Sequence, residues 1–170
     1  MENYRNYFLG SVILSRREGR DYIVDGQQRI TTLTLLLIFL HHLQNAMQTE
    51  HPTNLEDLIF SVRYGRRSFN LDVPERRMCL EALYNSEPFD TAEADESVLA
   101  MLERYADMQE QFPEELKGNA LPYFVDWLLE KVRLIEIVTS SDEDAYTIFE
   151  TMNDRGQPLG AVDMLKGYLL

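Results

Sequence analysis

A long apolar segment begins directly after a short β-like segment and an Asp-Gly pair, and this junction limits the folds open to the chain. Tyr22-Ile23-Val24 is typical of a strand, and Ile30 to Met47 carries apolar residues at the 3.6-residue period of a helix. An Asp-Gly pair also favours a hairpin turn, but a hairpin requires alternating residues on both sides. The residues after Arg29 do not alternate. The sequence therefore predicts a strand, a tight glycine loop and a helix in direct succession.

The remaining segments predict an α+β fold in which helices outnumber strands. Residues 58–69 are compatible with a strand or with irregular structure, and Ser141 is expected to cap a helix that ends before a loop at 153–158. A final helix is expected to run to Leu170. The predicted small sheet comprises residues 7–14, 22–25 and 132–138. The predicted parts of the chain are a strand-loop-helix lobe at 1–48, a helical insertion at 49–131 and a strand-helix-loop-helix segment at 132–170.

Composition excludes several classes of protein. The 170 residues carry a net charge of −13, which argues against bulk adhesion to DNA or anionic membranes but leaves a local basic groove open. A single cysteine, Cys79, excludes an internal disulfide framework and a cysteine zinc site. No apolar stretch approaches the roughly 20 residues that a bilayer requires. We therefore expect a cytoplasmic protein without membrane contact.

The predicted glycine loop and helix start form a candidate phosphate site. A helix start directs backbone N–H groups and the positive end of the helix dipole at one spot, where Arg29 can bind a phosphate in a bidentate way. Asp25 can hold a metal ion or orient a nucleophile. A purely structural turn remains the alternative, because the pattern has one glycine and no lysine and is not a P-loop. The residues available at this site are Asp25, Gly26, Gln27, Gln28, Arg29, Thr31 and Thr32.

A second polar segment lies near the end of the chain, at Asn153, Asp154, Arg155 and Gly156. Its structural interpretation is a helix end, where asparagine adopts a left-handed conformation and a glycine makes the turn. Its functional interpretation is a second part of the phosphate site. If both segments serve one site, they are expected to be neighbours in space.

Three stretches in this order resemble the DGQQR-motif domain of GmrSD-type type IV restriction enzymes. They are "YFLGSVIL" at 7–14, "IVDGQQRITTL" at 23–33 and "FETMNDRGQPLGAVDMLKGYLL" at 149–170. The resemblance implies a sheet lobe similar to ParB and sulfiredoxin, whose Gly-x-x-Arg element contacts nucleotide phosphates. Gly26 and Arg29 match that element.

The resemblance also implies an activity and its partners. Family members bind and hydrolyse nucleoside triphosphates, sense modified phage DNA and license a nuclease of the HNH type. It implies Mg²⁺ at Asp25 or at a carboxylate of the 153–156 loop, with Asp25 and Asp154 as the catalytic candidates. The nucleotide-binding residues that it implies are Gly26, Gln27, Gln28, Arg29, Asn153, Arg155 and Gly156. Thr31 and Thr32 join these candidates because their hydroxyls lie in the first turn of the predicted helix.

Departures from the family pattern leave a second class of function open. An upstream segment usual in the family is absent, and no nuclease motif is present, so no nuclease activity is expected from this chain alone. The chain begins almost on a predicted strand and ends inside a predicted apolar helix, so truncation is expected at both ends. The expected partners are the missing remainder of the polypeptide, a nuclease partner or a second copy of the chain. The alternative function is a non-catalytic interaction or regulatory module.

Two charged regions and a histidine pair complete the candidate sites. Five arginines at positions 63, 66, 67, 76 and 77 stand against Asp72 and Glu75, with Tyr64 among them. This basic cluster can contact nucleic acid, or it can be a solvated or pairing surface. Residues 87–115 carry ten acids and one arginine, typical of a solvated helix face. His41 and His42 are interpreted as the polar end of a buried helix.

Overall fold

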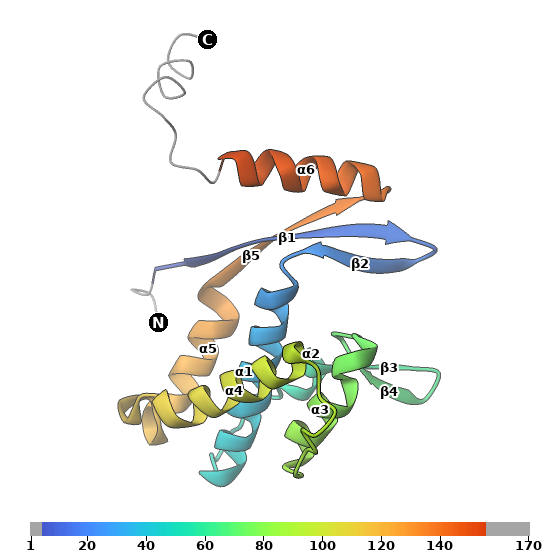
Figure 1. Ribbon diagram of the computed structural model, residues 1–170. Coiled ribbons are helices and arrows are strands. Elements are labelled where there is room, and N and C mark those ends of the chain that lie inside the picture. The colour runs from blue at the N-terminus through green and yellow to red at the C-terminus, as the bar shows by residue number, and fades with distance from the viewer. Residues whose placement is uncertain (1–4, 156–170) are drawn as a thin grey trace. The chain divides into compact units, whose positions relative to one another are not determined.

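Three strands that lie far apart in the sequence form one sheet, in the order β2-β1-β5. They are β1 (Tyr7–Arg17), β2 (Arg20–Asp25) and β5 (Val132–Thr139). The computed structural model describes residues 5–155 (Figure 1). Each strand includes the segment that the sequence predicts for it, so the small sheet and the mixed α+β class are confirmed.

Strands β1 and β2 form a hairpin that extends further than predicted. The sequence suggests a charged connection over residues 15–20, but β1 continues to Arg17 and β2 begins at Arg20. Glu18 and Gly19 alone make the turn, with φ angles of 51° and 73°, which suits the right-handed twist of paired strands. The charged residues join the ladder because Arg16 lies opposite Asp21 and donates to its carboxylate over 2.6 Å.

Helix α6 (Asp142–Arg155) follows β5 and packs against β2. Ser141 caps it as predicted, because its hydroxyl accepts from the Asp144 N–H over 3.1 Å. The prediction that the helix ends at Met152 is wrong, since α6 continues through residues 153–155. None of these three residues is glycine or proline, the residues that most strongly end a helix. Gly156, the rest of the predicted loop and the predicted final helix lie outside the described residues.

The described chain forms two units. One comprises residues 8–27 and 133–155, which hold the sheet and α6. The other comprises residues 5–7 and 28–132 and contains nearly all of the long helix α1 (Gln27–Ala46). Its further elements are α2 (Glu56–Ile59), β3 (Phe60–Arg63), β4 (Arg66–Phe69), α3 (Pro74–Asn85), α4 (Glu96–Gln111), 3-10 turns at Glu114–Leu116 and Gly118–Ala120, and α5 (Leu121–Lys131).

The hydrophobic core of this second unit surrounds α1. Leu35, Ile38 and Leu40 of α1 are completely buried, and the helix is partly or fully buried over most of its first half, as predicted. Met47, the expected end of its apolar stripe, is 40% exposed and lies after the helix has ended. The other elements supply the remaining buried side chains of the core, which include Leu55, Ile59, Cys79, Leu80, Val98, Met101, Leu121 and Val125.

Candidate functional site

The first motif folds as a strand, one glycine and a helix, as the sequence predicts. Strand β2 ends at Asp25 and α1 begins at Gln27. Gly26, the residue between them, has a φ of 91°, a conformation that residues with a side chain rarely adopt. Asp25 lies opposite Ile13 in the sheet, next to a register shift in β1. A single glycine therefore brings the carboxylate of Asp25 close to the positive end of a 20-residue helix.

Because a helix has about 3.6 residues per turn, the side chains of residues 28–32 lie on different faces of α1. Gln28, Thr31 and Thr32 line a cavity of about 30 Å³, which is large enough for about one water molecule. Arg29 projects from another face of the helix and is half-buried. The motif is therefore continuous in sequence, but its residues do not share one surface.

The hydroxyls of the two threonines contact arginines from other helices. Thr31 is 3% exposed and accepts from Nη1 of Arg76 in α3 over 3.0 Å. Thr32 accepts from Nη1 of Arg104 in α4 over 3.0 Å and donates to the carbonyl of Gln28 over 2.9 Å. Both hydroxyls thus tie α1 to its neighbours.

Arg76 and Arg104 contribute polar groups to this region, although sequence reasoning assigns Arg76 to the basic cluster and gives Arg104 no role. Arg76 is only 8% exposed, and its Nε donates to the Ser97 hydroxyl over 3.4 Å. Among the side chains that the structure describes, no carboxylate lies within 4.0 Å of either guanidinium. A sequence signal for Arg76 does exist, because it precedes the buried Cys79 and Leu80 by three and four positions on one helix face.

Asp95 extends this polar contact to the start of α4. Its carboxylate caps the helix by accepting from the Val98 N–H over 2.8 Å, and it also accepts from the Ser97 hydroxyl. These two hydrogen bonds, with the charge of Arg76, lower the pKa of Asp95 below its usual value. A chain of polar contacts therefore runs from Thr31 through Arg76 and Ser97 to the start of α4.

The second motif lies in the last described turn of α6. The backbone of Asn153, Asp154 and Arg155 is helical, while their side chains, and Gly156 as a whole, lie outside the described residues. Helix α6 packs against β2, whose last residue is Asp25. The helix that carries the second motif therefore packs against the strand that ends with Asp25 of the first motif. Whether Asn153 faces Arg29 stays a prediction.

Metal binding at this site would depend on a bound phosphate. Within the described ranges, no three His, Cys, Asp or Glu side chains are grouped to hold a metal ion. Mg²⁺ commonly binds through one or two carboxylates with phosphate and water oxygens completing its shell. Asp25 fits that pattern, because it lies beside the helix start where a phosphate is predicted.

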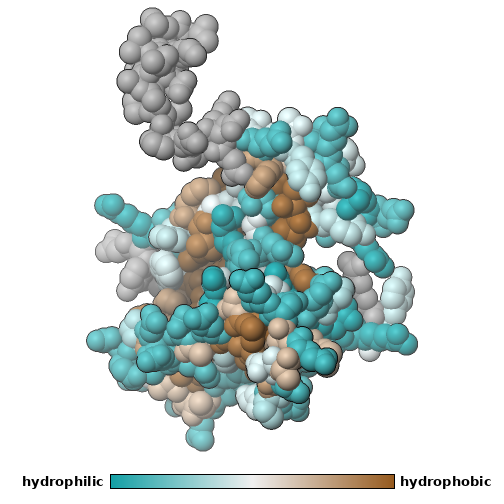
Figure 2. Space-filling model, in the orientation of Figure 1, coloured by the Kyte–Doolittle hydropathy of each residue, from teal (hydrophilic) through white to brown (hydrophobic). Residues whose placement is uncertain are grey.

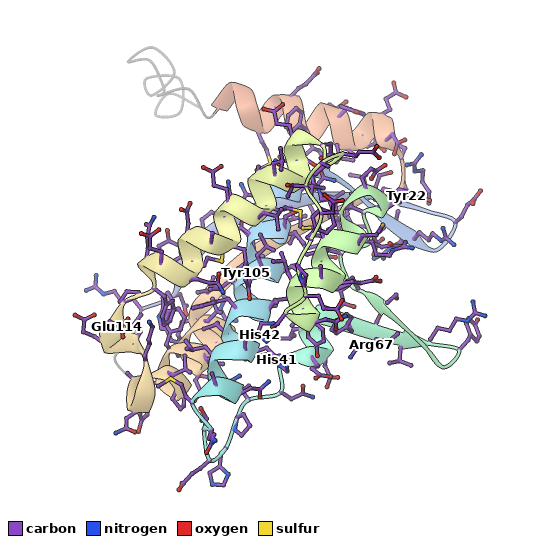
Figure 3. The ribbon with its side chains drawn as sticks, turned by 60° about the horizontal axis from the view of Figure 1, so that its bottom comes forward. Tyr22, His41, His42, Arg67, Tyr105 and Glu114 are labelled. Carbon is purple, nitrogen blue, oxygen red and sulfur yellow. The ribbon has the colours of Figure 1, made fainter. Side chains whose placement is uncertain are left out.

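The two histidines of α1 have structural contacts. The His41 ring stacks on Tyr84 with centroids 5.3 Å apart, and His42 Nε2 donates to the Leu83 carbonyl over 3.1 Å. Figure 3 labels both side chains, on α1. Burial, and secondarily the charge of His42, lowers the pKa of His41 below its usual value, while Glu56 acts in the opposite direction.

The lowered pKa of His41 predicts a pH dependence of stability. Around and below pH 6.5 the unfolded chain binds a proton at this residue more readily than the folded protein does. The free energy of unfolding should therefore fall as the pH is lowered from about 7.5 to about 5.5. Urea denaturation should show a smaller fall for His41→Gln than for the wild type. His51→Gln, an exposed control, should fall like the wild type, and equal falls in all three proteins would contradict the prediction.

Comparison with known proteins identifies the family. The fold is an α+β domain with a strand-glycine-helix junction, and no helix in residues 5–155 is long and apolar enough to cross a membrane. A family model described as "GmrSD restriction endonuclease, N-terminal domain" matches residues 1–170. The chain belongs to this family, and the family places it in a restriction system. No curated protein matches the chain.

Proposed function

We propose that this chain is the nucleotide-binding sensor of a modification-dependent DNA restriction system that acts in phage defence. The observation that carries the proposal is the junction of Asp25, Gly26 and the start of α1, found in a member of the GmrSD family. A phosphate beside Gly26 would meet the N–H groups of the first helical turn. Arg29 would add a charge-assisted contact.

The second motif would complete the site from α6. Asp25, with Asp154, would hold Mg²⁺ against the phosphates and direct water at the terminal phosphoryl group. Hydrolysis would release a nucleoside diphosphate and inorganic phosphate. Gln27, Gln28, Asn153, Arg155 and Gly156 would contact the rest of the nucleotide. Hydrolysis would then license a nuclease of the HNH type after modified DNA is sensed.

Nucleotide titration of Arg29→Ala tests this proposal. Loss of a hydrogen bond from a charged group costs about 1.5–3 kcal/mol, so binding of ATP or GTP with Mg²⁺ should weaken about ten- to a hundredfold. Arg20→Ala, an exposed control in β2, should bind like the wild type. Isothermal calorimetry measures the binding, and thermal melts of all three proteins report the fold.

Three outcomes would contradict this proposal. The first is a wild type that binds neither nucleotide. The second is an Arg29→Ala protein that binds as tightly as the wild type. The third is an Arg29→Ala protein that unfolds while Arg29→Gln folds normally and binds nucleotide as tightly as the wild type, since Arg29 would then serve the fold and not the phosphate.

One observation favours a non-catalytic interaction module as the second candidate. Thr31 and Thr32 contact Arg76 and Arg104 through their hydroxyls, so two of the predicted nucleotide-binding residues contribute to packing between helices. A module of this kind would bind a partner and release no phosphate. A phosphate-release assay separates the two candidates, because only the first predicts release with Mg²⁺ and its loss in Asp25→Asn.

A further inference from the structure

The hairpin of β3 and β4, residues 60–69, extends away from its unit and is here called the arginine hairpin (Figures 1 and 3). Tyr64 and Gly65 form its two-residue turn, with φ angles of 52° and 73°. The Tyr64 side chain at the tip is fully exposed, and Val62 beside it is 69% exposed. An aromatic residue thus occupies the most accessible position of the hairpin, where the described residues do not cover it.

Aromatic packing fixes the base of the arginine hairpin. The rings of Phe60 and Phe69 lie 4.5 Å apart, and Tyr84 of α3 contacts the Phe60 ring edge-on at 4.7 Å. The side chain of Asn70 donates to the Leu58 carbonyl over 2.9 Å. The hairpin is therefore anchored at one end and presents its tip to solvent.

Charge sets this hairpin apart from the rest of the protein. It contains three arginines, of which Arg66 has no carboxylate within 4.0 Å among the residues that the structure describes. The whole chain has a net charge of −13, and all of its acids lie outside the hairpin, ten of them in residues 87–115. Figure 2 shows a mostly hydrophilic surface over α3 and α4. A polyanion is thus attracted to the hairpin and repelled by much of the remaining surface.

A cavity of about 460 Å³ lies at the base of the arginine hairpin. The Arg67 guanidinium, which borders it, lies 4.0 Å from the centroid of Phe60 and 3.7 Å from the Glu56 carboxylate. Arg77 of α3 lines the same cavity and pairs with Asp72. The face of the Arg67 guanidinium stacks on Phe60, and a phosphate oxygen would compete with the Glu56 carboxylate for its edge.

We propose that the arginine hairpin enters a groove of double-stranded DNA. A two-stranded β-ribbon fits the major groove, which is about 12 Å wide. Arg66 and Arg67 would contact phosphates, and Tyr64 at the tip would contact base edges or sugars. The inference shares with the proposed function only DNA as a partner, since it requires neither a nucleotide nor the Asp25–Arg29 junction.

A DNA-binding titration tests this inference. Fluorescence anisotropy measures the affinity for a labelled duplex of about two helical turns over a range of salt concentrations. Arg66→Gln should weaken binding severalfold and lower the slope of log affinity against log salt by about 0.9, the value for one lost phosphate contact. It should leave the melting temperature unchanged, because Arg66 is exposed. Tyr64→Ala should weaken binding without changing this slope.

Arg20→Gln is the matched control, since it removes an exposed arginine of the other unit and should bind DNA like the wild type. The inference is overturned if the wild type shows no salt-dependent binding, if Arg66→Gln binds like the wild type, or if Arg20→Gln loses as much affinity as Arg66→Gln. Arg29→Ala should retain DNA binding. A loss of both nucleotide and DNA affinity in that variant would overturn this inference and leave the nucleotide site intact as a proposal.

Discussion

Replacement of Leu35 by alanine is expected to lower the free energy of unfolding by about 2–5 kcal/mol. Leu35 is completely buried in α1, within the core cluster that also contains Leu80, Met101 and Leu121. The substitution loses the burial of the leucine side chain and leaves a cavity that close-packed neighbours fill only in part. The midpoint of urea denaturation, with its slope, measures the change.

Leu99→Ala provides the matched control, because it makes the same chemical change at a side chain of α4 that is 44% exposed. Its effect should remain within about 0.5 kcal/mol. Equal losses in the two variants would show that Leu35 does not occupy the core that the structure assigns to it. An unchanged midpoint for Leu35→Ala would contradict the burial of α1 directly.

The path of α1 was predictable because its signal is local. Gly26 breaks the strand, and the long apolar segment after it has the length and period of a helix. The depth of burial of each side was less predictable. Within this apolar segment Leu36 and Leu37 are partly buried, whereas Leu35 and Ile38 are completely buried. The side of such a helix that is most buried depends on the elements that pack against it. The sequence of α1 alone does not show where those elements pack.

The same reason explains the errors at element ends. Residues 15–17 look like a charged connection, but cross-strand pairing of Arg16 with Asp21 places them in a ladder. Residues 60–63 alternate as a strand does, but Arg66, Arg67 and Ser68 after the Tyr64-Gly65 turn do not, so the sequence is compatible with a strand or with irregular structure. Whether a short polar segment forms a strand thus depends on the strand with which it pairs.

The candidate site shows this limit most clearly. Sequence order predicts the strand-glycine-helix junction at Gly26 and assigns Thr31 and Thr32 to it. Both hydroxyls also contact arginines of α3 and α4, which the order of residues does not show. The sequence places Arg76 in a basic cluster that is expected at the surface, but the residue is only 8% exposed. The contribution of Arg76 to the fold is therefore a quantity to measure.

Arg76→Met is expected to lower the free energy of unfolding by about 1.5–3 kcal/mol, the range for a hydrogen bond from a charged group. From α3 the guanidinium donates to Thr31 of α1 and to Ser97 of α4, so it joins three helices. Methionine retains a long unbranched side chain in the same space and removes only the polar contacts. Urea denaturation of the wild type and the variant measures the loss.

Arg77→Met separates this role from a general effect of charge, because Arg77 is the next residue of α3, is exposed and pairs only with Asp72 among described carboxylates. An exposed ion pair contributes little, so its denaturation midpoint should match that of the wild type. The buried Arg76 guanidinium, with no described carboxylate within ion-pair distance, also carries a cost of desolvation. If Arg76→Met is as stable as the wild type or more so, that cost exceeds the value of its two hydrogen bonds. The contact between the three helices would then depend on apolar packing alone, and the role assigned to Arg76 would be wrong.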